Sequence, residues 1–264
     1  MFSKSRARFI PVMLVISAYI AGCATSELPH GQDAIWHLVV IGDSTLWGVG
    51  DVYASQIEKD VGVKVVLEDF SMGGLSAGEV LDVLQGEETS RFQLQKLPEA
   101  LKDAEVVVLF VNPVNSIDPE RPLKIMACVD VYHADTSCSP ETFEMWITDL
   151  KAIWAEILKI RKGKETILRA LDIYNPVVIP WEEQGIYEAC TECWINQSNA
   201  ARLAAEAYNI PFLSRYDAFN GTSHLEDPRE KGYISSDGFH LSELGCQYTA
   251  ELLSQMGYEP ISPP

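Results

Sequence analysis

Short apolar runs alternate with segments of helical periodicity along most of the chain, and this alternation constrains the fold more than any other feature. Residues 105–111 are almost all β-branched or aliphatic, which favours a buried strand. Residues 141–161 carry large apolar side chains at helical spacing, which predicts a long amphipathic helix. The other strands are expected at residues 37–41, 63–67, 166–173 and 210–213. Strands that alternate with helices predict a three-layer α/β domain, in which helices cover both faces of a central five-stranded parallel sheet.

The other helices follow from the same pattern and from one local motif. Ser76-Ala-Gly-Glu79 has the spacing of a capping box, which predicts that a helix begins there. No repeat or linker interrupts residues 35–264, so this range is expected to be a single domain. The remaining helices are expected at residues 49–59, 98–102, 191–208 and 242–256.

The loops that follow the strands are expected to share one edge of the sheet. In parallel sheets, ligands bind beyond the carboxyl ends of the strands. We therefore looked for functional side chains in these loops, which comprise residues 42–50, 70–76, 112–140, 174–190 and 214–240.

The first residues have the pattern of a bacterial lipoprotein signal peptide, expected over residues 1–22. Three basic residues precede a short apolar run, and Ile20-Ala-Gly-Cys23 resembles the lipoprotein cleavage box. We expect cleavage before Cys23, acylation of its thiol and a tether over residues 23–34. The protein would then be extracytoplasmic and held at the cell membrane by its lipid anchor. Ordinary signal cleavage nearby and an uncleaved anchor are the alternatives.

The charge balance excludes one class of partner. The chain has 38 Asp and Glu residues against 20 Lys and Arg, a net charge of −18, and it contains no basic patch. Such a chain repels phosphate backbones, so we expect no nucleic-acid partner. We expect the protein to be a monomer.

Five cysteines remain after the predicted cleavage site. In an exported protein, Cys128, Cys138, Cys190 and Cys193 are expected to form disulfides, whose pairing the sequence leaves open. A zinc site built from the four thiolates is the alternative, although the spacing is not that of two paired C-x₂-C motifs. Cys246 is expected to be a buried thiol.

A candidate nucleophile lies where the first predicted strand ends. Gly42-Asp43-Ser44 places a serine at the functional edge of the sheet, beside a helix whose N–H groups favour negative charge. A serine hydroxyl is a weak nucleophile on its own and needs a base. The alternative is a plain turn, because all three residues are common in turns.

A candidate base lies near the other end of the chain. Asp237-Gly-Phe-His240 precedes the last predicted helix. Because Asp237 and His240 are three residues apart in a turn, the carboxylate can fix the tautomer of the imidazole and leave its other nitrogen facing the edge of the sheet.

Donors for an oxyanion could come from three places. Gly73 and Gly74 follow the second predicted strand and could offer a backbone N–H. Asn112 follows the third strand and could offer its side-chain amide, and the N–H of Ser44 would be a further donor. Each of these residue types is also common in ordinary turns and loops.

Together these blocks resemble the SGNH (GDSL-type) esterase and lipase family. The specific parts are residues 41–48 and 236–245, and the resemblance extends over the whole mature domain. It implies a flavodoxin-like fold and hydrolysis of carboxylic esters without a metal or cofactor. It also implies that Ser44 is the nucleophile, His240 the base and Asp237 the residue that orients the base.

The same resemblance bears on the oxyanion hole. Gly74 matches the oxyanion glycine of the family because it precedes Leu-Ser-Ala at the start of the second helix, and Gly73 is the alternative. The family shows Gly-x-Asn-Asp after the third strand, whereas this chain has Val111-Asn-Pro-Val-Asn-Ser. We prefer Asn112 as the amide donor because it is closest to the strand, and Asn115 is the alternative.

The sequence thus predicts a lipid-anchored serine esterase or lipase that acts on a small-molecule or glycan ester, such as an acetyl ester of a carbohydrate or an acyl lipid. A non-catalytic binding lipoprotein with the same fold is the alternative, which the altered third block favours. A metal-dependent enzyme is a third hypothesis. Four aromatic residues are candidates for a pocket wall or for packing: Trp47, Trp181, Tyr187 and Trp194.

Overall fold

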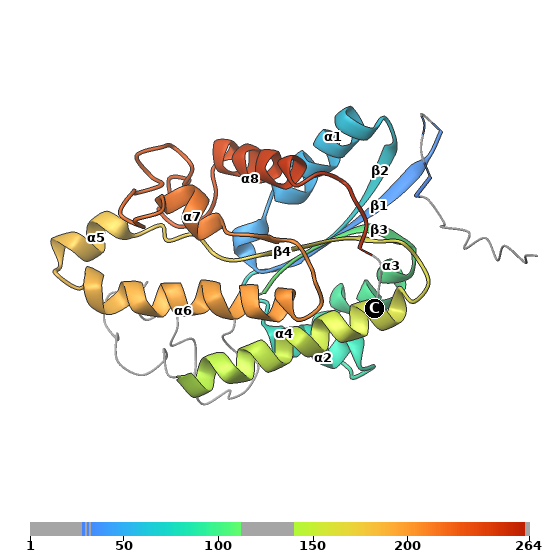
Figure 1. The fold of residues 1–264 in the computed structure, drawn as a ribbon, viewed down its shortest axis with the longest axis horizontal. Coiled ribbons are helices and arrows are strands. Elements are labelled where there is room, and N and C mark those ends of the chain that lie inside the picture. Colours follow the sequence, from blue (N-terminus) through green and yellow to red (C-terminus); the bar gives the residue numbers. More distant parts are fainter. Residues whose placement is uncertain (1–27, 30, 32, 112–139, 262–264) are drawn as a thin grey trace, which may run out of the picture.

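A parallel sheet forms the centre of the fold. The structure is a computed structural model, and it describes residues 28, 29, 31, 33–111 and 140–261. Within this part of the chain, five parallel strands lie in the order β2-β1-β3-β4-β5 (Figure 1). They are β1 (Ile35–Gly42), β2 (Lys64–Ser71), β3 (Ala104–Phe110), β4 (Ile167–Leu171) and β5 (Phe212–Leu213). The predicted α/β class with a five-stranded parallel sheet is confirmed.

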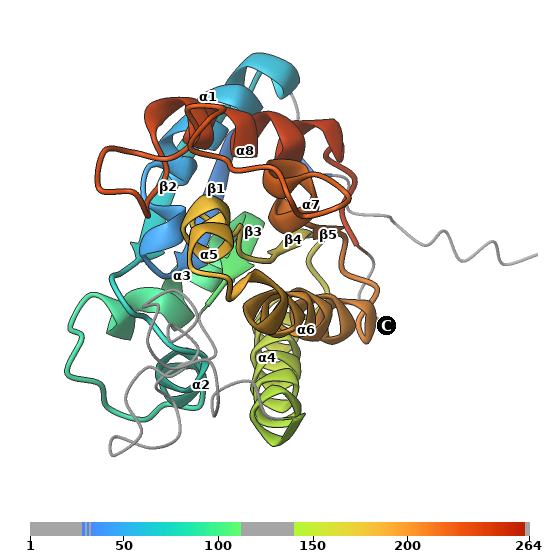
Figure 2. The same cartoon turned by 90° about the vertical axis from the view of Figure 1, so that its left-hand side faces the viewer.

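Helices cover both faces of this sheet (Figure 1, Figure 2). One face is covered by α1 (Val49–Val61) and α8 (Glu243–Gln255), which pack against each other. The other face is covered by α2 (Ala77–Leu84), α3 (Leu97–Asp103), α4 (Pro140–Ile160) and α6 (Tyr187–Glu206). Helix α4 packs against α2, α3 and α6. The arrangement has the three layers that the alternating pattern predicted.

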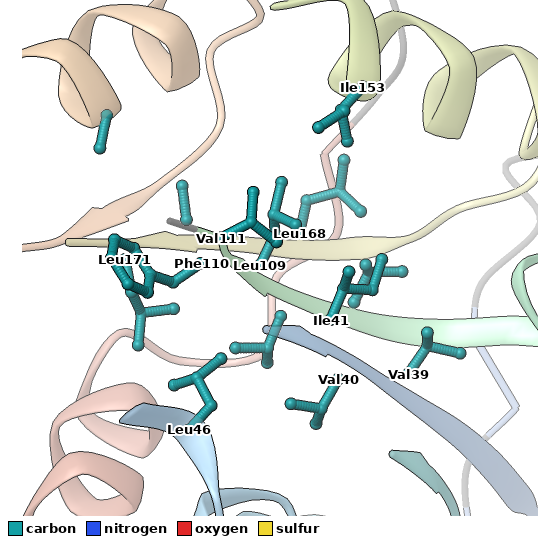
Figure 3. Close-up of a cluster of buried hydrophobic side chains, with 14 of the residues drawn as sticks. Val39, Val40, Ile41, Leu46, Leu109, Phe110, Val111, Ile153, Leu168 and Leu171 are labelled. Atoms are coloured by element: carbon teal, nitrogen blue, oxygen red, sulfur yellow. The ribbon is translucent and has the colours of Figure 1, made fainter. Parts of the chain in front are cut away.

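The apolar runs of the central strands form the core between the two helical layers. Val39, Val40 and Ile41 of β1 are all buried. Figure 3 shows side chains of β1 and β3 meeting Leu168 of β4, with Ile153 of α4 on one side of the sheet. Because helices cover both faces, these strands need continuous apolar runs instead of alternating polar and apolar residues.

Two helices begin with the caps that the sequence indicated. Ser76 Oγ accepts a hydrogen bond from the Glu79 N–H, and the Glu79 carboxylate accepts one from the Ser76 N–H, which is the predicted capping box of α2. Ser242 Oγ accepts from the Gly245 N–H at the start of α8. These bonds satisfy backbone donors that a helix leaves unpaired, and they fix where both helices begin.

Some element boundaries differ from the prediction. β2 continues to Ser71 and does not stop at residue 67, because it is an edge strand that pairs with β1 along its whole length and can carry polar residues such as Glu68. Helix α6 begins at Tyr187, earlier than the predicted residue 191.

Three short elements lie in segments that were expected to be loops, and a fourth, η2 (Leu94–Lys96), lies in a segment for which no element was predicted. Helices α5 (Val178–Glu183) and α7 (Arg215–Asn220) have six residues each, and η1 (Ser44–Leu46) and η2 are single 3₁₀ turns. Elements this short contain too few turns for apolar periodicity to indicate them.

The strand order places a topological switch point between β1 and β3, where ligands bind in folds of this kind. At this point Gly42 pairs with Ser71 of β2 and with Phe110 of β3. The chain turns back directly after Gly42: a Cβ there would lie 2.5 Å from Leu46 Cδ1 and 3.0 Å from the Phe110 carbonyl oxygen, so a larger residue would force its neighbours to shift. The carboxyl ends of β1, β2 and β3 therefore lie side by side.

The predicted signal peptide and Cys23 lie outside the described residues. Leu28 and Pro29, from the predicted tether, contact the start of the domain: Leu28 is buried, and the Pro29 carbonyl accepts a hydrogen bond from the Trp36 indole (2.7 Å). None of the helices in the described ranges combines the length and the apolar character that a membrane crossing requires.

Gly245 should be essential for the docking of α8. A Cβ at this position would lie 2.2 Å from the Tyr233 carbonyl oxygen, which is backbone and cannot move aside cheaply. We expect Gly245→Ala to lower the free energy of unfolding by about 3 kcal/mol in urea denaturation. Gly50→Ala in α1 is the matched control. The atoms nearest to its Cβ would be side-chain methyl groups, of Leu67 at 3.1 Å and of Val40 at 3.3 Å. Its cost should therefore be below about 1 kcal/mol, and equal losses in both variants would contradict this account.

Candidate active site

Ser44 is presented by a tight turn at the end of β1. It is the first residue of η1, and Asp43 caps this 3₁₀ turn. Asp43 Oδ1 accepts hydrogen bonds from the Thr45 N–H (2.8 Å) and from Thr45 Oγ1 (2.7 Å), and both residues are buried. The buried neighbours hold the turn rigidly and leave Ser44 itself half-buried at the edge of the sheet.

The structure brings Ser44 together with His240 and Asp237. His240 Nε2 lies 2.9 Å from Ser44 Oγ, although the two residues are 196 positions apart. On the other side of the ring, His240 Nδ1 lies 2.7 Å from Asp237 Oδ2. The three side chains form one continuous chain of hydrogen bonds, the arrangement that activates a serine hydroxyl.

Asp237 is held in its ionised form by its own turn. Its carboxylate accepts hydrogen bonds from the backbone N–H groups of Phe239 (2.8 Å) and His240 (2.9 Å) and from Ser235 Oγ (2.8 Å). The Phe239 N–H, followed by the His240 ring, lowers the pKa of Asp237 far below its usual range. Since folding lowers this pKa, the stabilisation is fully present above the ordinary carboxyl range and is lost only as the pH falls through the lowered value. An ionised Asp237 favours a proton on Nδ1, which leaves Nε2 free to accept the Ser44 proton.

Trp47 forms a wall of the site. Its indole stacks on the His240 ring, with the ring centroids 5.1 Å apart, and its Nε1 donates to the Ser71 carbonyl (3.3 Å). Trp47 is 48% exposed, so part of this large aromatic residue is open to a ligand. Trp181 and Trp194 instead are buried and pack edge to face against each other, which favours packing for these two.

The glycine turn after β2 also lies close to Trp47. A Cβ at Gly73 would be 3.5 Å from the Trp47 ring, while Gly74 has φ +64° and open space around its Cα. The turn is closed by a hydrogen bond from the Leu75 N–H to the Met72 carbonyl (3.0 Å). The third expected donor lies outside the described residues, as does its alternative, so the choice between Asn112 and Asn115 stays a prediction.

A buried guanidinium forms hydrogen bonds to the turn that carries Ser44. Arg215 is fully buried, and its Nη1 and Nη2 donate to the Thr45 carbonyl (2.9 Å) and to Thr45 Oγ1 (3.3 Å). Its Nε donates to the Asp172 carbonyl (2.6 Å). The cation lies over the rings of Phe110 (5.1 Å) and Tyr174 (5.4 Å). A positive charge in this interior is compensated by its hydrogen bonds, the aromatic faces and nearby carboxylates.

Asp172 is the buried carboxylate beside this guanidinium. It accepts hydrogen bonds from Ser198 Oγ (2.5 Å), Ser214 Oγ (2.9 Å) and the Arg215 N–H (2.5 Å). Burial raises the pKa of Asp172 to about 6, although its hydrogen bonds and the Arg215 charge act to lower it. Because folding raises this pKa, Asp172 lowers the stability of the folded state as the pH rises from the ordinary carboxyl range to about 6.

Cys246 is a free, buried cysteine, as predicted, and its Sγ donates to the Trp47 carbonyl (3.3 Å). Burial raises the pKa of its thiol to about 11, so the thiol remains protonated near neutral pH. Cys190 and Cys193 are buried in α6, and the pairing of the four remaining cysteines stays a prediction because Cys128 and Cys138 lie outside the described residues. In the part of the chain that the structure describes, no group of three His, Cys, Asp or Glu side chains could hold a metal ion.

Sequence reasoning missed the charged residues that support the site. Asp172 directly follows β4, and Arg215 comes shortly after β5, so both lie at the predicted functional edge. A search for every charged residue within a few positions of a strand's carboxyl end would have found them. Arg91, which contacts the glycine turn, follows no strand directly and gives no comparable signal.

The fold is similar to several solved structures. The lipase Lip_vut3 from a goat rumen metagenome is 22% identical, with a TM-score of 0.61 over 85% of this chain and 98% of that protein. A protein described as a GDSL-like lipase, from Parabacteroides merdae ATCC 43184, is 15% identical, with a TM-score of 0.56 over 88% of this chain and 100% of that one. A lipase/acylhydrolase from Enterococcus faecalis is 16% identical, with a TM-score of 0.50 over 86% of this chain and 99% of that one.

No family model and no curated protein matches the sequence. At such low identities the structural likeness concerns the fold, and it extends over nearly the whole length of the similar proteins. The chain shares the α/β fold of these lipases, with the five-stranded parallel sheet that the sequence predicted.

Removing the Arg215 cation should destabilise the protein strongly. Arg215→Met leaves the Asp172 charge without its cation, and we expect a loss of about 3–5 kcal/mol in the free energy of unfolding near pH 8. The loss should be smaller near pH 5, because Asp172 is then protonated and carries no charge to compensate. Urea denaturation at both pH values measures this difference.

Arg169→Met is the matched control for this prediction. Arg169 is equally buried, but among the residues that the structure describes it donates to the carbonyls of Leu168 (2.8 Å) and Gly257 (2.7 Å) and to no carboxylate. Its loss should be smaller, about 1–3 kcal/mol, and should not depend on pH in this range. The same pH dependence in both variants would show that Asp172 is not the cause.

Proposed function

We propose that this protein is a serine esterase or lipase that hydrolyses carboxylic esters. The observation that carries the proposal is the hydrogen-bonded chain from Ser44 Oγ through His240 to Asp237 at the carboxyl edge of a parallel sheet. The likeness to proteins named as lipases supports the same chemistry.

In the first half of the reaction, Ser44 is acylated. Ser44 Oγ attacks the ester carbonyl carbon while His240 Nε2 takes the hydroxyl proton. The two atoms Nε2 and Oγ are 2.9 Å apart, which is within hydrogen-bond reach. The carbonyl oxygen becomes an oxyanion that accepts hydrogen bonds from the N–H groups of Ser44 and Gly74, and Asn112 remains the predicted third donor. The bond to the alcohol oxygen then breaks, His240 returns its proton to the departing alcohol, and the acyl group remains on Ser44.

In the second half, water replaces the alcohol. His240 takes a proton from a water molecule, whose oxygen attacks the acyl carbon, and the same donors hold the second oxyanion. The bond to Ser44 Oγ breaks and Oγ recovers the proton from His240. The products are one alcohol and one carboxylic acid, and the enzyme returns to its starting state. Asp237 remains ionised throughout and holds the imidazole in position.

The substrate class follows from the wall of the site and from the expected location. The exposed part of Trp47 beside His240 suits an acyl chain or a sugar ring, so acetyl esters of carbohydrates and acyl lipids are both consistent with the proposal. A protein anchored outside the cytoplasm through Cys23 would meet either class. Rates on acetyl, butyryl and longer-chain esters measure the acyl preference.

Ser44→Ala should abolish turnover. We expect kcat/KM for p-nitrophenyl acetate to fall by at least about 10³-fold. The melting temperature should stay close to that of the wild type, because Ser44 is only half-buried. A fluorophosphonate probe should label the wild type at Ser44 and leave the variant unlabelled. A wild type that resists the probe and hydrolyses no ester of the panel would support the non-catalytic binding protein instead.

Hydrolysis should decline on the acid side of neutrality. A protonated His240 cannot accept the Ser44 proton, so kcat/KM should fall as the pH is lowered from about 8 to about 5. Asp237 should not contribute to this decline, because its lowered pKa keeps it ionised over the whole range. A profile that is flat over this range would exclude a histidine base.

A further inference from the structure

Arg91 forms hydrogen bonds to the glycine turn that is expected to supply an oxyanion donor. It lies in the segment between α2 and η2. Its Nη1 donates to the Gly73 carbonyl (3.1 Å), and its Nη2 reaches the Gly74 carbonyl at 3.5 Å. One guanidinium therefore contacts two successive carbonyls of a turn that has no regular secondary structure of its own.

The guanidinium is itself held in place by α2. Arg91 Nε donates to Glu79 Oε1 (2.7 Å), and the pair is only about 30% exposed. The other carboxylate oxygen, Glu79 Oε2, accepts from the N–H (3.1 Å) and the hydroxyl (2.9 Å) of Ser76. The capping box of α2, the Arg91 side chain and the glycine turn are thus one network, in which Glu79 sets the position of the cation.

Peptide geometry connects this network to the oxyanion. In a trans peptide, the carbonyl of one residue and the N–H of the next point in opposite directions, and the described chain contains no cis peptide bond. The Gly73 carbonyl points toward Arg91, so the Gly74 N–H points away from it. A hydrogen bond that fixes the Gly73 carbonyl therefore also fixes the direction of the Gly74 N–H.

From this geometry we infer that Arg91 is a positioning residue for the oxyanion hole, acting through the peptide between Gly73 and Gly74. The inference rests on the proposed ester hydrolysis and adds to it. Arg91 has two effects on that peptide. First, it restrains a glycine turn that would otherwise sample many conformations. Gly74 has a left-handed backbone, and it has no side chain that could pack against neighbours and hold the turn in place. Second, the charge of Arg91 polarises the peptide, which strengthens the Gly74 N–H as a donor.

The first test compares variants of Arg91 in the full chain. We expect Arg91→Met to lower kcat/KM for p-nitrophenyl acetate by roughly 10- to 100-fold, mainly through kcat, because losing an oxyanion donor outright costs about 10²–10³-fold and here the donor is only misoriented. Arg91→Lys should be intermediate, since an ammonium keeps the charge but lacks the fork that reaches Glu79 and the turn together. Glu79→Gln should weaken the reaction less than Arg91→Met, because the amide can still hold the cap.

Arg202→Met is the matched control. Arg202 also pairs with a carboxylate, Glu206, at 2.7 Å, but it lies on α6 and contacts no glycine turn. Its removal should leave kcat/KM within about twofold of the wild type. Thermal unfolding of all variants shows whether a loss of activity is accompanied by a loss of stability.

A trifluoromethyl ketone separates positioning from a general structural role. It adds to the serine as a tetrahedral adduct, whose oxyanion occupies the oxyanion hole. Across the Arg91 and Glu79 variants, the inhibition constant should rise by the same factor by which kcat/KM falls. The labelling rate with a fluorophosphonate should fall in parallel.

Two results would overturn the inference while leaving the proposed function intact: an Arg91→Met enzyme with the kcat/KM of the Arg202→Met control, or one that loses kcat/KM while its inhibition constant stays unchanged. A wild type that neither hydrolyses esters nor reacts with the fluorophosphonate would instead overturn the proposed function, and this inference with it.

Discussion

The guanidinium of Arg215 joins the parts of the molecule that must be aligned for the site to exist. It donates to the Thr45 carbonyl directly after the candidate nucleophile and to the Asp172 carbonyl at the end of β4. It also lies against Phe110 at the end of β3. A charge in a dry interior tolerates little displacement, because every lost hydrogen bond leaves an uncompensated group. The ends of three strands are therefore held in one arrangement by a single side chain.

Charged side chains also hold the other parts of the site in place. Backbone N–H groups hold the Asp237 carboxylate, and that carboxylate orients His240. The Glu79–Arg91 pair holds the glycine turn. In both places a charged side chain orients a candidate reacting group, and its own position is set by hydrogen bonds with a turn or a helix. Dipoles that are oriented before the substrate arrives need no rearrangement during the reaction, which is the usual source of electrostatic catalysis.

The sequence predicts those features that depend on neighbours along the chain. The apolar run of β3, the periodicity of α4 and the capping box at Ser76 each contain their own signal, and all three elements are present. The turn that carries Asp237 and His240 is equally local. Arg215 and Arg91 could not be assigned from the sequence, because their partners lie on other elements and the sequence records no distance between them. Helices α5 and α7 were missed because six residues contain too little periodicity.

The separation of Ser44 from His240 has a consequence for how the chain acquires reactivity. The turn with Ser44 directly follows β1, whereas His240 comes just before the last helix, α8. This helix must pack against α1 before the two side chains meet. Closing so long a stretch of chain costs more conformational entropy than closing a local contact. A nascent or partly folded chain would carry a serine of ordinary reactivity, so the onset of hydrolysis would report that the whole domain has folded.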